Sequence, residues 1–196
     1  MNTLPQLLFL ILILVCAGAM NMVFVKAPIL NGLSRPMDRG VRFRDGKRVL
    51  GDNKTWKGFL GMIAITAICL AAAGSLATNI PDIQRLSLIP FEEFKSPSTV
   101  WFFGALWGLA YVLAELPNSF LKRRIDIPPG KNARGMKGFL CLVLDQADSV
   151  IGCVIVLPLF SSISWLDAIM LVVLGSLIHY LTNVGLFAVH LKKQAG

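Results

Sequence analysis

The sequence has 196 residues, of which 55% are hydrophobic, and a formal net charge of +8 at pH 7. Its mean hydropathy of +0.67 is too high for an ordinary soluble domain, so we expect a membrane protein. Because the sequence offers no soluble basic domain, the pI of about 9.6 does not indicate nucleic-acid binding. The 4 cysteines form no CxxC pair, which argues against a zinc or redox motif.

Five apolar stretches approach or reach the length needed to cross a bilayer, for which about 20 helical residues suffice. They cover residues 4–25, 59–78, 100–116, 138–160 and 165–189. No Lys or Arg precedes the first stretch, so we interpret it as a retained helix and not a signal peptide. The expected fold is an all-α integral membrane protein with five transmembrane helices in one bundle, forming a single domain over residues 1–196.

Basic residues are concentrated in alternate connections between these stretches. Residues 26–58 contain nine Lys or Arg against three Asp, and residues 117–137 contain six against one. The connection at 79–99 has two basic and three acidic residues. The positive-inside rule then places the N-terminus outside and both basic loops, with the C-terminus, in the cytoplasm. We expect a multi-pass protein of the cell (inner or plasma) membrane; the simplest alternative is that these charges only set topology and attract anionic lipid.

Three acidic residues fall within or at the edge of the apolar stretches. Asp145 and Asp148 are three residues apart, so they share one helix face, and Glu115 lies at the cytoplasmic end of the third stretch. A carboxylate within hydrocarbon costs about 2.5–3.5 kcal/mol on insertion scales, which a bound cation can offset. Mg²⁺ prefers carboxylate oxygens and bridges substrate phosphates, so we predict that these three acids bind Mg²⁺. The alternative, a salt bridge to a lysine from a loop, explains one acid but not three.

A second motif, "LGDNKTWKGF" at 50–59, stands where a basic loop enters the second stretch. We expect Asp52 or Asn53 to N-cap that helix, leaving Lys54 and Thr55 beside free backbone N–H groups that can bind a phosphate. The alternative is a plain interfacial anchor.

The third motif, "ELPNSFLKRRIDIPPG" at 115–130, follows the third stretch. Pro117 is expected to end that span, and Ser119, Lys122 and Arg123 can then donate hydrogen bonds to a phosphate. Alone, the motif is also typical of a basic flank that stops translocation.

Together these motifs resemble the CTP-dependent phospholipid cytidylyltransferases. The signature of phosphatidate cytidylyltransferase is matched by Ser119, Lys122-Arg123, Pro129-Gly130 and the Asp-x-x-Asp pair in "LDQADS". The five-span form with "PMDRGVRFRDGKRVLGDNKTWKGF" after the first span more closely resembles the CDP-archaeol synthase family, over about residues 21–152. The sequence departs from the phosphatidate enzymes in two features. Glu115 stands where those enzymes have an aspartate, and the motif with a proline and histidine-glycine that precedes their aspartates is missing before Asp145.

The resemblance implies a reaction in which CTP and a lipid phosphate, of archaeol or phosphatidic-acid type, give CDP-lipid and pyrophosphate. It implies Mg²⁺ as cofactor and CTP, a membrane lipid phosphate and the bilayer as partners; it leaves a homodimer open. The expected catalytic residues are Lys54, Lys122, Asp145 and Asp148. The expected substrate-binding residues are Asp38, Lys54, Thr55, Lys57, Asn118, Ser119, Lys122 and Arg123.

Two other functions are compatible with parts of the sequence. A small proton or cation transporter could use the three acids with His179 as a relay, but a relay predicts acids spread across the bilayer. We expect His179 to be a packed or hydrogen-bonded interior residue instead. A scaffold protein could use Gly104-x-x-x-Gly108 as a helix contact, which leaves the basic motifs unexplained.

Overall fold

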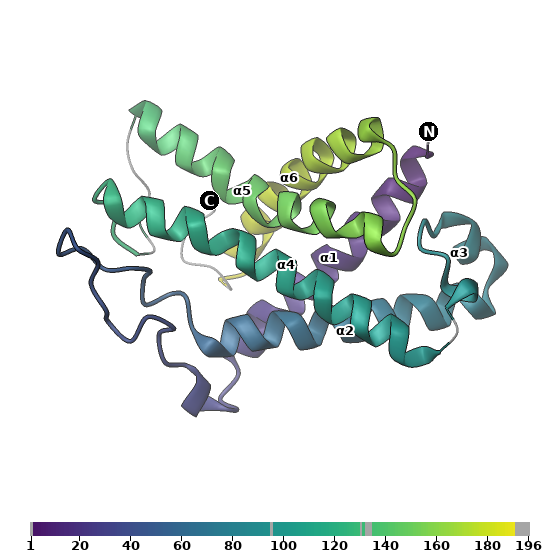
Figure 1. Ribbon diagram of the computed structural model, residues 1–196, viewed down its shortest axis with the longest axis horizontal. Helices are drawn as coiled ribbons and strands as arrows, with labels where there is room; N and C mark the ends of the chain where they lie inside the picture. Colours follow the sequence, from purple (N-terminus) through teal and green to yellow (C-terminus); the bar gives the residue numbers. More distant parts are fainter. Residues whose placement is uncertain (1, 95, 130, 132–134, 191–196) are drawn as a thin grey trace.

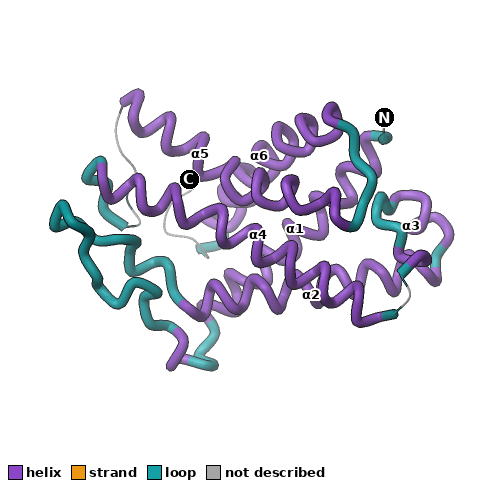
Figure 2. Tube along the Cα trace, viewed as in Figure 1, coloured by secondary structure: helices purple, strands orange, loops and turns teal. Residues whose placement is uncertain are grey.

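The computed structural model describes residues 2–94, 96–129, 131 and 135–190, and its regular structure is helical (Figures 1 and 2). Five long helices are joined by short α-helical and 3-10 segments. In chain order the elements are α1 (Leu4–Lys26), η1 (Asn31–Leu33), α2 (Trp56–Asn79), α3 (Pro81–Leu86), η2 (Phe91–Glu93), α4 (Pro97–Arg124), α5 (Gly135–Val156), η3 (Leu157–Leu159) and α6 (Trp165–Ala188).

The five long helices close into a ring. α1 packs against α2, α2 against α4, α4 against α5, α5 against α6, and α6 returns to α1. The interior of the bundle is therefore bounded by all five helices, and a side chain from any of them can contribute to one central site.

The outer surface of this ring is apolar. All five helices are long and apolar enough to cross a membrane. Large side chains point outward, with Leu12 54%, Ile155 71% and Val173 62% exposed. Such a surface requires a hydrocarbon environment, because a soluble protein rarely exposes so large an apolar area. The prediction of an all-α protein with five helices long and apolar enough to cross a membrane is confirmed.

Consecutive long helices run in opposite directions, so the connections gather at two ends (Figure 1). The N-terminus, the α2–α4 connection and the α5–α6 turn lie at one end, where Asn2 donates to Asp167 at 2.9 Å and Ser161 donates to the Leu88 carbonyl at 2.7 Å. The α1–α2 loop and the α4–α5 connection lie at the other end. Both predicted basic loops therefore share one end of the bundle.

The prediction that Pro117 ends the third span was wrong. α4 continues through this residue to Arg124, so the first part of the predicted loop 117–137 is helical. A proline removes the hydrogen bond that its own N–H would donate to the carbonyl four residues earlier, here Leu113, and its ring crowds that carbonyl. Neighbouring helices support such an interruption in a transmembrane helix. The other four spans end within four residues of the predicted positions.

The predicted N-cap of the second span was also wrong. Asp52 and Asn53 lie in a turn before the helix, and Thr55 caps it by accepting a hydrogen bond from the Gly58 N–H at 3.2 Å. Threonine is a favourable N-cap because its hydroxyl satisfies an N–H group that has no partner within the helix.

Two glycines allow α2 and α4 to approach closely. A Cβ added at Gly104 would lie 2.6 Å from the Cα of Ala67, and one added at Gly108 would lie 2.8 Å from the Met62 carbonyl oxygen. The Gly104-x-x-x-Gly108 pair is thus used within the bundle, as small residues are at other transmembrane helix contacts.

Candidate active site

A cavity of about 530 Å³ lies inside the ring and is lined by residues of all five long helices. Its volume is within the usual range for a small-molecule site. Toward the end with the N-terminus its lining is apolar and includes Leu10, Leu14, Trp107, Leu157 and Leu171. Toward the loop end its lining is charged. An amphiphilic ligand would match both parts.

One face of α4 supplies the polar lining. Glu115, Asn118, Ser119 and Lys122 are spaced at three, four and seven residues, so they lie along one side of the helix, and all four line the cavity. This alignment exists because the helix continues through Pro117. A loop beginning there would not have set these side chains in one row.

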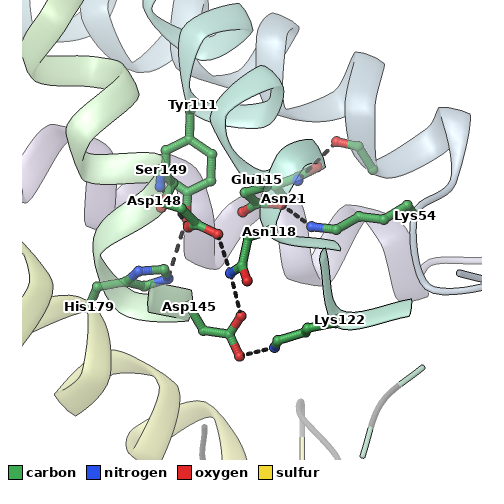
Figure 3. Close-up of polar contacts among 11 residues, drawn as sticks. Asn21, Lys54, Tyr111, Glu115, Asn118, Lys122, Asp145, Asp148, Ser149 and His179 are labelled. Atoms are coloured by element: carbon green, nitrogen blue, oxygen red, sulfur yellow. Dashed lines mark hydrogen bonds and ion pairs between the residues drawn. The ribbon is translucent and has the colours of Figure 1, made fainter. Parts of the chain in front are cut away.

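The two aspartates of α5 face this row (Figure 3). The Asn118 amide donates to Asp145 Oδ1 at 2.7 Å and to Asp148 Oδ2 at 2.8 Å. The other oxygen of Asp145 accepts from Lys122, and the other oxygen of Asp148 accepts from the Ser149 N–H at 2.6 Å. All four carboxylate oxygens are therefore hydrogen-bonded, as buried charged groups require.

Lys54 reaches the same site from the loop before α2, where it pairs with Glu115 (Figure 3). Burial lowers the pKa of this ammonium, but the charge of Glu115 and its hydrogen bond, with the charges of Asp148 and Asp145, raise it above the ordinary value. Lys54 is thus protonated at neutral pH. All three predicted acids therefore lie near enough to the Lys54 ammonium to affect its pKa.

Arg123 differs from the neighbouring Arg124 in its partners. Among the described residues Arg123 forms no ion pair; it is 7% exposed, its Nε donates to the Ser119 carbonyl at 3.4 Å, and its Nη1 has no hydrogen-bond partner. It lines the cavity. Arg124 instead pairs with Asp45, donates to the Arg48 carbonyl and lies over two phenylalanine rings. A buried cation without a counter-ion indicates an anion-binding position.

Two of the predicted substrate-binding residues lie outside the cavity lining. Asp38 organises the α1–α2 loop, where its side chain is 2% exposed and pairs with Arg48. Lys57 is buried between α1 and α2, where its ammonium donates to the Ala27 carbonyl at 2.7 Å and lies 5.2 Å from the centre of the Phe24 ring. Both contacts give these residues a structural role. Thr55, predicted to bind phosphate, is the N-cap and also lines the cavity.

The two loops at this end contact each other. A Cβ added at Gly51 would lie 2.9 Å from Cγ of Pro129, so the α1–α2 loop passes directly against the α4–α5 connection. The Lys131 N–H donates to the Pro128 carbonyl at 3.2 Å, which forms a turn, and Lys131 lines the cavity. Gly130 of the predicted motif lies outside the described residues.

The donor set at Asp145 and Asp148 fits a small divalent cation. Both carboxylates reach one nitrogen of Asn118, so one ion in that position can contact both, with oxygen ligands of the kind Mg²⁺ prefers. In the described part of the chain no three His, Cys, Asp or Glu residues already stand in a metal-binding cluster. Two of the three predicted acids, Glu115 and Asp145, are instead paired with lysines.

A second polar group lines the α6 side of the cavity, and apart from His179 its members were not singled out from the sequence. His179 lies 3.3 Å from the Tyr111 hydroxyl and 3.3 Å from the Gln146 carbonyl, and Asn183 donates to the Gln146 side chain at 2.8 Å. The expectation that His179 is a hydrogen-bonded interior residue is confirmed. His179 and Asn183 are four residues apart in an apolar stretch, and this spacing predicts that one face of the helix is polar.

Five apolar helices around a cavity that joins an apolar part to a cluster of carboxylates and cations define a membrane-embedded enzyme. The family profile described as "CarS-like: CDP-archaeol synthase" matches residues 3–195. The CDP-archaeol synthase of Thermofilum pendens is 33% identical over 177 residues, covering 90% of this chain and 73% of that protein. The CDP-archaeol synthase of Pyrococcus furiosus is 33% identical over 160 residues, covering 81% of each.

A solved structure of an intramembrane enzyme for archaeal membrane lipid biosynthesis shares the fold. Its TM-score is 0.56 at 24% identity, and the match covers 86% of this chain and 91% of that one. The chain therefore belongs to the CDP-archaeol synthase family, and it is a CTP-dependent cytidylyltransferase. The match over nearly the whole chain gives no support to the transporter alternative.

Proposed function

We propose that the protein transfers CMP from CTP to a lipid phosphate of the archaeol type, giving CDP-lipid and pyrophosphate. The observation that carries this proposal is the cavity itself, in which apolar side chains continue directly into a cluster of acids and cations. A lipid phosphate can place its chains among Leu10, Leu14 and Leu171 while its headgroup reaches the charged end. The name of the relatives favours an isoprenoid ether lipid over phosphatidic acid.

The reaction needs no protein nucleophile, because the lipid phosphate is already ionised. One of its oxygens attacks the α-phosphorus of CTP, and the bond to the oxygen bridging the β-phosphorus breaks, so that pyrophosphate leaves with that electron pair. The protein contributes position and charge neutralisation. Arg123, Lys54 and Lys122 would bind phosphate oxygens, and Asn118 and Ser119 would donate hydrogen bonds from the same α4 face.

Asp145 and Asp148, with Glu115, would hold Mg²⁺ at the polar end of the cavity. The bound ion would supply positive charge that stabilises the phosphate groups and the leaving pyrophosphate. Before substrate binds, the carboxylates hold Lys54 and Lys122 at the polar end of the cavity.

The charge distribution supports an orientation with the N-terminus outside and the charged end of the cavity at the cytoplasmic face of the cell membrane. CTP would enter from that side, and one domain over residues 1–196 would carry the whole site. The lipid would remain in the bilayer throughout.

The direct test is to incubate the purified protein with CTP, Mg²⁺ and either an isoprenoid ether glycerol phosphate or phosphatidic acid. We expect CDP-lipid and pyrophosphate in equal amounts, with the ether lipid preferred. Omitting Mg²⁺ should abolish product. The matched control variant is Asp126→Asn, which changes a carboxylate that is 78% exposed in the loop and should retain full activity. Absence of product with both lipids would contradict the proposal.

A further inference from the structure

The acids proposed to hold the cation and the lysines proposed to bind phosphate are, in the structure, each other's partners. Lys122 pairs with Asp145 and Lys54 pairs with Glu115. These lysine side chains are only 15% and 21% exposed, so both ion pairs lie largely out of solvent. A cation that binds either carboxylate is repelled by the lysine paired with it, and an anion that binds either lysine is repelled by the paired carboxylate.

Each of the four aspartate oxygens already accepts a hydrogen bond. Asp145 accepts from Asn118 and Lys122, and Asp148 accepts from Asn118 and the Ser149 N–H. A divalent cation in the position between the two carboxylates would displace the Asn118 nitrogen that lies there, and its charge would repel the Lys122 ammonium from Asp145.

We infer that the site binds its divalent cation and its nucleotide by ion exchange, so that each ligand binds tightly only when the other is present. This inference rests on the proposed function. With the cation alone, Lys122 and Lys54 would stand unpaired beside a doubly charged ion. With the nucleotide alone, its phosphates would lie beside three carboxylates. When both bind, the carboxylates exchange lysine for metal, the lysines exchange carboxylate for phosphate, and no buried charge is left unpaired.

Arg123 lies outside this exchange. It is buried in the same cavity but forms no ion pair among the residues that the structure describes, so phosphate binding there breaks no existing contact. Arg123 should therefore strengthen nucleotide binding with or without metal, whereas Lys122 and Lys54 should determine how strongly the two ligands depend on each other.

The experiment measures Mn²⁺ binding to the full-length protein in detergent micelles without lipid phosphate, using the electron paramagnetic resonance signal of free Mn²⁺. Titrations are run with and without CTP, and CTP binding is measured with and without Mn²⁺. We expect each ligand to raise the affinity for the other by the same factor, about tenfold or more, since coupling between two sites is reciprocal. A factor below two, after correction for Mn²⁺ bound by free CTP, would overturn the inference.

The sharpest variant is Lys122→Met, which removes the ammonium and keeps a flexible chain of similar length. Because Asp145 then has no lysine to release, Mn²⁺ without CTP should bind this variant about tenfold or more tightly than it binds the wild type. The further increase in Mn²⁺ affinity on adding CTP should be smaller than in the wild type. Lys54→Met should act in the same direction through Glu115 and serves if Lys122→Met fails to fold. Unchanged or weaker Mn²⁺ binding in a folded variant would overturn the inference.

Lys47→Met is the matched control. Lys47 forms an ion pair with Asp126 in the loops, outside the cavity lining, so Mn²⁺ binding should be unchanged. A similar gain in Lys47→Met would mean that overall charge, and not exchange, sets the affinity, and would contradict the inference.

The same preparations separate the inference from the proposed function. If the wild-type protein makes CDP-lipid but binds Mn²⁺ and CTP independently, the function stands and the exchange is wrong. If it makes no CDP-lipid from either lipid phosphate, the proposed function fails, and the titrations still decide whether metal and nucleotide are coupled.

Discussion

At the scale of single residues, substitution of a buried acid distinguishes a role in activity from a role in stability. Asp148→Asn keeps the shape of the side chain but removes the charge proposed to bind metal. We expect activity to fall by at least about a hundredfold, the scale of losing one strong electrostatic contact in the transition state. The unfolding midpoint in detergent should be no lower than that of the wild type, because a buried anion is removed.

Asp126→Asn is the control for this prediction. If the defect of Asp148→Asn is weaker metal binding, added Mg²⁺ or Mn²⁺ should restore part of its activity. A variant that remains active but unfolds more easily would show instead that Asp148 is a structural residue.

The two adjacent arginines should respond in opposite ways. Arg123→Gln removes a buried cation that has no carboxylate partner within the described part of the chain, so we expect the KM for CTP to rise about tenfold or more while stability is retained. Arg124→Gln breaks the contacts with Asp45 and Arg48, so it should lower stability with little effect on KM. Steady-state kinetics and thermal unfolding of both variants check this. Equal KM values for the two would contradict the assignment.

At the scale of structural elements, the α2–α4 contact depends on the absence of a side chain. Gly104→Ala places a methyl group 2.6 Å from the Cα of Ala67, so the helices must separate. We expect a loss of about 1–3 kcal/mol, typical of overpacking. Gly185→Ala is the control, because a Cβ there meets no atom within 4 Å. Denaturation in mixed micelles compares the two, and equal stabilities would mean that the contact can adjust.

The α1–α2 loop should become less ordered at low pH, because Asp38 loses the charge that holds its contacts. Burial raises the pKa of Asp38, but hydrogen bonds from Arg48, the Leu50 N–H and the Gly40 N–H outweigh this effect and lower it. A carboxyl group whose pKa is lower in the folded state contributes stability above its unfolded pKa of about 3.9, and that contribution is lost as the pH falls through the folded value.

We therefore expect hydrogen exchange in the loop to be slow at neutral pH and to increase, relative to the intrinsic rate, below about pH 4. Asp38→Asn should show faster exchange already at neutral pH and little further change in acid. A loop whose protection does not depend on pH in the wild type would contradict this account.

At the scale of the whole molecule, orientation is the main prediction. In a background without native cysteines, Arg44→Cys should be reached by a membrane-impermeant thiol reagent only from the cytoplasmic side. Glu92→Cys, in the connection at the opposite end, should be labelled only from outside. Both side chains are exposed, so access depends only on the side of the membrane. The reverse pattern would place the charged end of the cavity outside, away from cytoplasmic CTP.

The class of protein, the five apolar spans and most charged groups in the cavity could be predicted from the sequence alone. Hydrophobic length is a local property, and a buried carboxylate is conspicuous in an apolar stretch, so Asp145, Asp148 and Glu115 could be selected without a structure. The motif with Lys122 and Arg123 was recognisable for the same reason, since its charges are consecutive in the chain.

The partner of each charge, in contrast, depends on how the helices pack in three dimensions. Arg123 and Arg124 are adjacent in sequence, yet one faces the cavity and the other the loop, because successive residues of a helix point about 100° apart. The continuation of α4 through Pro117 depends on support from neighbouring helices, which local preference does not contain. The pairing of Lys54 with Glu115 joins residues 61 positions apart, and the packing of α2 against α4 brings them together.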